Sequence, residues 1–190
     1  ATIRFIRTFW ALETGLAYSR HYPAINWMTS YSGYLEFIEK WWAANIDKNW
    51  GNLRSQAYDI LQREDALKEI VRLLGPEALP DEEKLILDVA RMEKIGFLQQ
   101  SAFDDVDIYS SPHKQVKMLE IFVSYYREAL NALKNDVSLQ EIRSMPIVPR
   151  IMRAKFEIKN EELNKLDKLK EDIVEAFGKL VKKEEVAKVV

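Results

Sequence analysis

The stretch SPHKQVKMLEIFVSYYREALNAL, from Ser111 to Leu133, carries the clearest structural signal in this sequence. Its apolar residues recur every three or four positions, the spacing of one face of an α-helix: Leu119, Phe122, Tyr126, Leu130 and Leu133. Ser111 is a preferred N-cap residue, and Pro112 suits the first helical turn because its missing N–H would have no partner there. The stretch predicts an amphipathic helix whose apolar face is buried.

The flanking sequence repeats this helical pattern. Only six Gly and six Pro interrupt a chain rich in good helix formers, so helix is the default expectation. From Pro23 onward, apolar residues are again three or four apart, and this spacing favours a helix: Ile25, Met28, Tyr31, Leu35, Ile38 and Trp42. Further helices are predicted from about 50 to 74, from Pro80, from the capping box SLQE at 138–141, and from Asn160 to the end.

The first residues differ from the rest. Ile3 and Phe5 alternate with Thr2 and Arg4, which is the period-2 pattern of a β-strand. No second convincing strand is evident, although a single strand cannot be stable alone. We therefore predict an all-α fold, a bundle of about six helices with one short N-terminal strand.

Composition excludes several classes of protein. An apolar content of 47% over 190 residues is ample for one packed domain. The formal charge of −2 disfavours a general nucleic-acid module, and the lack of Cys excludes disulfides and thiolate zinc sites. No apolar run approaches the roughly 20 residues that cross a bilayer, and Arg4 and Arg7 interrupt any signal-peptide core. A first residue of Ala suggests a processed chain or an excised piece.

No complete active site is visible in the sequence. The glycines do not form a phosphate-binding loop, and His21 and His113 lack zinc-site spacing. Asp104, Asp105 and Asp107 lack the ligand ladder of a calcium loop, so we expect them to cap loop backbone. We predict no catalytic residue and no metal site. The irregular segment 97–112 mixes polar and aromatic residues, and such segments often carry binding residues.

Two long segments add a resemblance. FWALETGLAYSRHYPAINWMTSYSGYL, from Phe9 to Leu35, and FLQQSAFDDVDIYSSPHKQVKML, from Phe97 to Leu119, resemble the C-terminal portion of the catalytic A subunit of the archaeal-type (A/V-type) rotary ATP synthases. This resemblance implies that residues 1–12 are a strand and linker from a preceding nucleotide-binding domain. Residues 13–190 would then be the C-terminal helical bundle domain.

The resemblance also implies a site. In the family, the aromatic residue before PAIN flanks the adenine of ATP, and the QQ-x-A-F loop lies against the base from the other side. The implied adenine-binding residues are Tyr22, Gln99, Gln100, Ala102 and Phe103. Pro23 restricts Tyr22 to extended conformations, so its ring would stack with little loss of freedom. Tyr22 stands where the family usually has Phe, and the alternative role for its ring is packing at a helix entrance.

The resemblance carries expectations about the whole enzyme as well. In the family, the P-loop, the magnesium-site residues and the catalytic glutamate precede this region, so ATP or ADP with Mg would bind the intact protein, and the present chain alone would be inactive. The implied partners are the B subunits of an A3B3 hexamer and the central stalk of a proton- or sodium-translocating enzyme, at the cytoplasmic side of the membrane. Residues 47–54 or 74–83 would contact the stalk.

One competing interpretation needs no nucleotide. A free-standing helical adaptor could bind protein partners through exposed aromatic residues. Unchanged ATP kinetics after removal of the Tyr22 ring would favour it.

Overall fold

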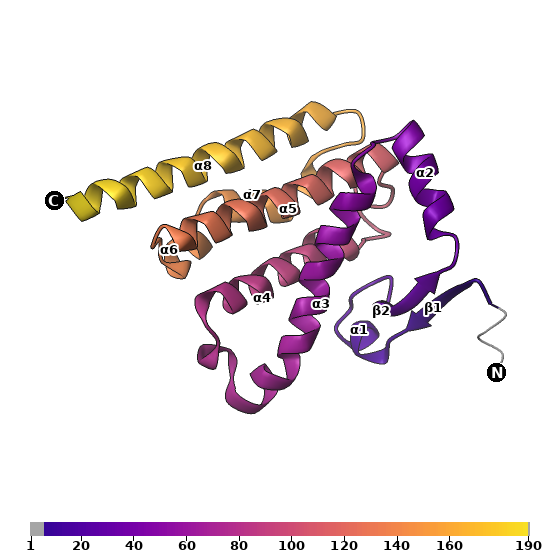
Figure 1. The fold of residues 1–190 in the computed structure, drawn as a ribbon. Helices are drawn as coiled ribbons and strands as arrows, with labels where there is room; N and C mark the ends of the chain where they lie inside the picture. Colours follow the sequence, from indigo (N-terminus) through magenta and orange to yellow (C-terminus); the bar gives the residue numbers. More distant parts are fainter. Residues whose placement is uncertain (1–5, 190) are drawn as a thin grey trace.

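The long helix α5, Pro112–Lys134, is the centre of the fold. In this computed structural model, which describes residues 6–189, α5 lies side by side with α8 (Leu163–Val189) and packs on α3 (Trp50–Leu74) and α4 (Asp81–Glu93) (Figure 1). Its N-terminus forms as predicted, because the Ser111 hydroxyl accepts a hydrogen bond of 3.2 Å from the Lys114 N–H. The predicted fold class, a helical bundle with a short β-element at its N-terminal end, is confirmed.

The buried surface of α5 is wider than the predicted stripe. Leu119 and Phe122 are buried as expected, whereas Tyr126, Leu130 and Leu133 are only partly buried. The fully buried positions instead include Tyr125, Ala129 and Ala132. Because neighbouring helices cover α5 from several sides, its buried residues extend around the helix beyond one stripe.

Three of the predicted helices start within one residue of the expected position, and α8 starts slightly late. Helix α3 ends before Gly75, whose φ of 80° only glycine adopts readily. Helix α4 carries three acidic residues in its first turn, and the Ser138 hydroxyl caps α6 (Leu139–Ser144) by accepting from the Glu141 N–H. Helix α8 begins at Leu163, three residues after the predicted start at Asn160.

The predicted helix from Pro23 is wrong over its first half. Residues Ile25–Ser32 form strand β2, which pairs antiparallel with strand β1, Thr8–Leu12, and only Leu35–Asn45 form a helix, α2. The segment INWMTSYS is rich in aromatic and β-branched residues, which favour a strand, and β1 supplies the partner strand. A second strand therefore exists, contrary to the prediction. The strand expected at Ile3 and Phe5 lies outside the described residues.

Three short helices were not predicted from the sequence. These are helix α1 (Thr14–Tyr18), the one-turn 3₁₀ helix η2 (Pro76–Ala78) and helix α7 (Ile147–Glu157). Pro146 and Pro149 obscure α7, but Pro149 lies in its first turn, where no intrahelical N–H bond is lost. A π-helical turn, η3 (Lys94–Leu98), continues α4.

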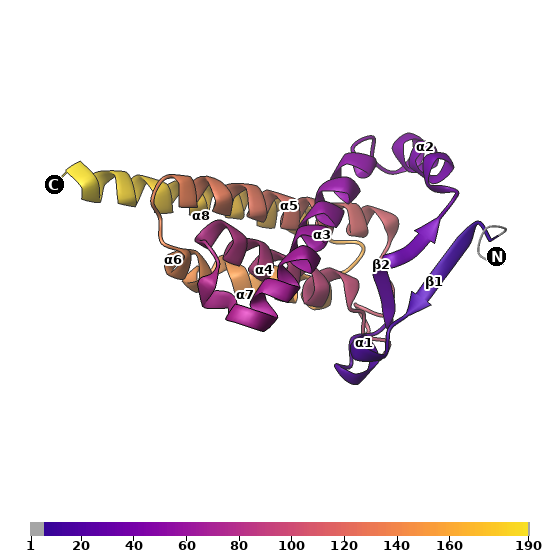
Figure 2. The same ribbon diagram turned by 60° about the horizontal axis from the view of Figure 1, so that its bottom comes forward.

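The β1–β2 hairpin lies at one end of the bundle, and the C-terminus of α8 lies at the other (Figure 2). The turn between α1 and β2, the loop after η3 and the C-terminal end of α7 are brought together near the hairpin. This junction contains the candidate site. Within residues 6–189, no helix is both long and apolar enough to cross a bilayer.

Candidate functional site

The first part of the site is the turn that follows α1. Arg20 has a positive φ of 58°, which reverses the chain, and the peptide bond between Tyr22 and Pro23 is cis. His21 is buried, with its ring centroid 5.6 Å from that of Trp27. This buried neighbour anchors the turn, while the Tyr22 side chain remains 54% exposed. The alternative for Tyr22, a ring packed at a helix entrance, is disfavoured, since a strand, β2, follows it and the residue is more than half exposed.

The second part is the loop after η3. Gly96 lies against α5 so closely that an added Cβ would come 2.9 Å from Cζ of Phe122. Glycine at this position therefore lets the chain run against α5 just before the loop begins. Gln99 closes the turn with a hydrogen bond from its N–H to the Lys94 carbonyl, 2.8 Å.

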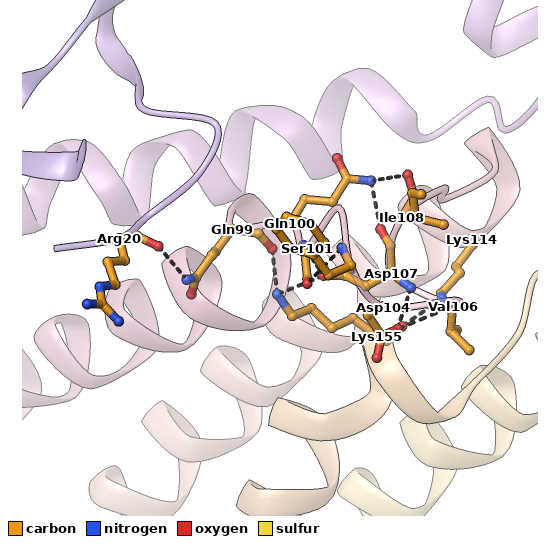
Figure 3. Close-up of polar contacts among 11 residues, drawn as sticks. Arg20, Gln99, Gln100, Ser101, Asp104, Val106, Asp107, Ile108, Lys114 and Lys155 are labelled. Atoms are coloured by element: carbon orange, nitrogen blue, oxygen red, sulfur yellow. Dashed lines mark hydrogen bonds and ion pairs between the residues drawn. The ribbon is translucent and has the colours of Figure 1, made fainter. Parts of the chain in front are cut away.

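Two hydrogen bonds join these parts directly. The Gln100 N–H donates to the Tyr22 carbonyl at 2.7 Å, and the Gln99 side-chain amide donates to the Arg20 carbonyl at 3.1 Å. The second of these bonds is drawn at the left of Figure 3. Segments nearly 80 residues apart in sequence are thus held in fixed register.

All five residues implied by the resemblance line one cavity of about 300 Å³. Tyr22 and Phe103 contribute exposed rings, and Phe103 is as exposed as a side chain can be. Ala102 is also exposed, and Gln99 is partly buried. A concave wall with projecting aromatic rings suits a flat ligand that stacks on them.

Gln100 has a structural role within the loop. Its side-chain NH₂ donates to the carbonyls of Asp107, at 2.8 Å, and Ile108, at 3.3 Å. These donors hold the loop in shape, as Figure 3 shows.

The cavity also contains residues that sequence reasoning missed, namely Arg20, Ile95, Ser101, Lys155 and Phe156. Lys155 belongs to α7 and is buried at 5% exposure. Its Nζ donates to the Gln99 carbonyl at 2.5 Å and lies 3.3 Å from Oδ2 of Asp107. One sequence signal could have revealed it: Lys155 follows Ile147 and Ile151 at four-residue intervals, so a lysine occupies the apolar face of a helix.

The charges beneath the cavity are two buried lysines and one buried aspartate. Burial lowers the pKa of Lys155, opposed by the nearby charges of Asp107 and Asp104. Burial likewise lowers the pKa of Lys114, whose Nζ donates to the Lys155 carbonyl at 2.9 Å. The pKa of His21 is lowered by burial and then by Lys155 and Lys94, which favours a neutral imidazole.

The aspartates of the loop cap its backbone, as predicted for Asp104 and Asp107. Oδ1 of Asp104 accepts from the N–H groups of Val106 and Asp107, and Oδ2 of Asp107 accepts from the Ser101 N–H at 2.7 Å. Between residues 6 and 189, no three His, Asp or Glu side chains group in a way that could hold a metal ion. The site therefore offers shape and stacking surfaces, with no metal-ligating cluster for phosphate chemistry among the described residues.

Comparison with known proteins identifies the family. The family described as the C-terminal domain of V and A type ATP synthase matches residues 39–143. The chain is 50% identical over 182 residues to the A subunit of the A-type ATP synthase of Hyperthermus butylicus, covering 95% of this chain and 30% of that protein. The corresponding protein of Sulfolobus acidocaldarius is 44% identical over 183 residues, which are 95% of this chain and 31% of the relative. For Pyrococcus abyssi the identity is 44% over 182 residues, which are 96% of this chain and 18% of the relative.

The chain thus spans about a third or less of the length of these relatives. The match of the family over more than half of the chain, together with the identities above, gives its classification. This chain belongs to the family of C-terminal domains of V- and A-type ATP synthases.

Proposed function

We propose that this domain completes the adenine pocket of the catalytic A subunit of an A-type ATP synthase. One observation carries the proposal: Tyr22, Gln99, Gln100, Ala102 and Phe103 line a single cavity, and a backbone hydrogen bond joins its two segments. In the proposed complex, the Tyr22 ring stacks on one side of the base, and the loop with Ala102 and Phe103 lies on the other. The phosphates and Mg²⁺ bind to parts of the enzyme outside this chain, so the isolated chain is expected to hydrolyse no ATP.

The proposed domain division follows from this role. Residues 1–12 belong to the nucleotide-binding domain that precedes the bundle, and residues 13–190 form the C-terminal bundle. Exposed aromatic residues on α2 are available for contact with that domain, namely Phe37 and Trp41.

The domain further couples ATP synthesis or hydrolysis to rotation and ion transport. In this proposal it lies between B subunits in the head of the complex, peripheral to the membrane on its cytoplasmic side, and touches the central stalk. Of the two candidate stalk contacts, residues 74–83 are favoured, because Leu73 and Leu74 are 74% and 71% exposed beside the Gly75 turn. Nucleotide binding and rotor position then influence each other through the same bundle, as linkage requires.

The test is the variant Tyr22→Ala in the full-length protein, assembled with its partners. Stacking of a base on an aromatic ring contributes about 1–3 kcal/mol, so the KM for ATP should rise by about fivefold to about 150-fold, and kcat should change little. Tyr22→Phe, which retains the ring, is the matched control and should keep the wild-type KM. ATP kinetics unaltered by Tyr22→Ala would refute the stacking role and favour the adaptor alternative.

A further inference from the structure

Lys155 links the bundle to the wall of the cavity. Its ammonium group lies between the two ends of the turn 99–107, touching the Gln99 carbonyl at one end and the Asp107 carboxylate at the other. Figure 3 shows the side chain reaching from α7 into the centre of this polar cluster. Its Nζ also lies 4.5 Å from the ring centroid of Phe156, another cavity residue.

The tip of the turn has little packing of its own. Ala102 and Phe103 are exposed, so apolar burial contributes little to their placement. Asp107 fixes the turn instead, because Oδ2 accepts from the Ser101 N–H at 2.7 Å, just before Ala102. Lys155 therefore positions Asp107, and Asp107 positions the exposed part of the cavity wall at Ala102 and Phe103.

The burial of this lysine carries a free-energy penalty. Ile147 and Ile151, two turns and one turn earlier on the same face of α7, are buried, and an apolar side chain at position 155 would avoid the desolvation of an ammonium group. Buried ion pairs are often no more stabilising than apolar replacements. A contribution to stability alone therefore does not explain why a lysine occupies this buried position. A role in fixing the geometry of the turn does explain it.

We propose that Lys155 is a positioning residue for the base-binding wall, acting through the Gln99 carbonyl and Asp107. This inference rests on the proposed function. Lys155 keeps the turn at the distance from Tyr22 that a flat base requires, and it makes that distance depend on the position of α7. Its loss should weaken binding of the base and leave phosphate binding unaffected.

The experiment uses Lys155→Met in the full-length, assembled protein, because Met keeps most of the side-chain length and removes the ammonium group. The readouts are KM and kcat for ATP and the inhibition constant of inorganic tripolyphosphate, which carries phosphates without a base. We expect KM for ATP to rise about tenfold, corresponding to about 1.4 kcal/mol, with kcat and the tripolyphosphate constant within about twofold of wild type. Lys155→Arg keeps the charge and should recover part of the loss.

Two further variants serve as control and safeguard. Arg150→Met removes an exposed cation of the same helix that pairs with Asp172 on α8, and it should leave all three constants unchanged. If Lys155→Met does not assemble, Asp107→Asn takes its place, since the amide removes the charge that faces Lys155. It should give the same base-selective rise in KM.

The results distinguish failure of the positioning role of Lys155 from failure of the proposed function. If Tyr22→Ala raises KM and neither Lys155→Met nor Asp107→Asn does, the positioning role is refuted and the proposed function stands. A parallel rise in KM and in the tripolyphosphate constant would also refute it, because that pattern indicates general damage. If Tyr22→Ala also has no effect, the proposed function itself fails.

Discussion

Replacing Glu93 by Gln should remove a large pH dependence of stability. Glu93 lies at the C-terminal end of α4 and is 1% exposed, and neither carboxylate oxygen has a hydrogen-bond partner among the described residues. The nearest charge in sequence, Lys94, binds Glu64 at 2.6 Å instead. Burial raises the pKa of Glu93 from 4.5 to about 9, and the charge of Lys94 opposes this shift.

The sign and size of the effect follow from proton counting. Between about pH 5.5 and pH 7.5 the folded protein keeps the Glu93 proton, whereas the unfolded chain has lost it. Stability therefore falls as pH rises, by about 1.36 kcal/mol per pH unit from this group. Gln has no proton to lose, so the free energy of unfolding of Glu93→Gln relative to wild type should rise by about 2.7 kcal/mol over these two units.

Urea unfolding followed by far-UV circular dichroism at both pH values measures this difference. Glu82→Gln makes the same chemical change at an exposed position of the same helix and serves as the control. If the stability difference between Glu93→Gln and wild type is the same at both pH values, the carboxyl group is ionised in the folded protein. The description of Glu93 as a buried neutral acid would then be wrong.

Two local features carry the remaining predictions. Gly96→Ala should destabilise the chain by about 1–3 kcal/mol, because its Cβ would lie 2.9 Å from Cζ of Phe122. Thermal unfolding measures this loss. Gly178→Ala is the control and should not destabilise the chain, because nothing lies within 4 Å of the added Cβ. Ser111→Ala should lower stability by about 1 kcal/mol through loss of the α5 cap, while Ser111→Asp should keep the cap and most of the stability. Equal stability of the Ala and Asp variants would contradict the capping role.

The helices were predictable where local signals agree. At α5, the apolar spacing, the cap Ser111 and the first residue Pro112 indicate the same start. At α3, the apolar spacing and Gly75 indicate the same end. Strand β2 was not predictable in this way, since its apolar residues fit three-and-four spacing and its strand character depends on pairing with β1. Helix α7 was hidden by two prolines whose positions at a helix start become clear only in the structure.

The candidate site was also predictable only in part. Five site residues were identified by resemblance to a family, because their segments are long and specific: Tyr22, Gln99, Gln100, Ala102 and Phe103. Their contact could not be read from the sequence, since it depends on hydrogen bonds across nearly 80 residues, such as that from the Gln100 N–H to the Tyr22 carbonyl. Lys155 was missed because a lysine inside a helical run is usually an exposed residue, and only its burial reveals its role.

Photolabelling of the full-length protein tests the central claim most directly. A nucleotide with an azide on its base, 2-azido-ATP, labels the side chains that contact the base, and peptide mapping locates the label. We predict labelled Tyr22 or labelled residues within 99–103, and protection of both by excess ATP. Labelling confined to peptides outside this domain would contradict the assignment of the cavity to the adenine.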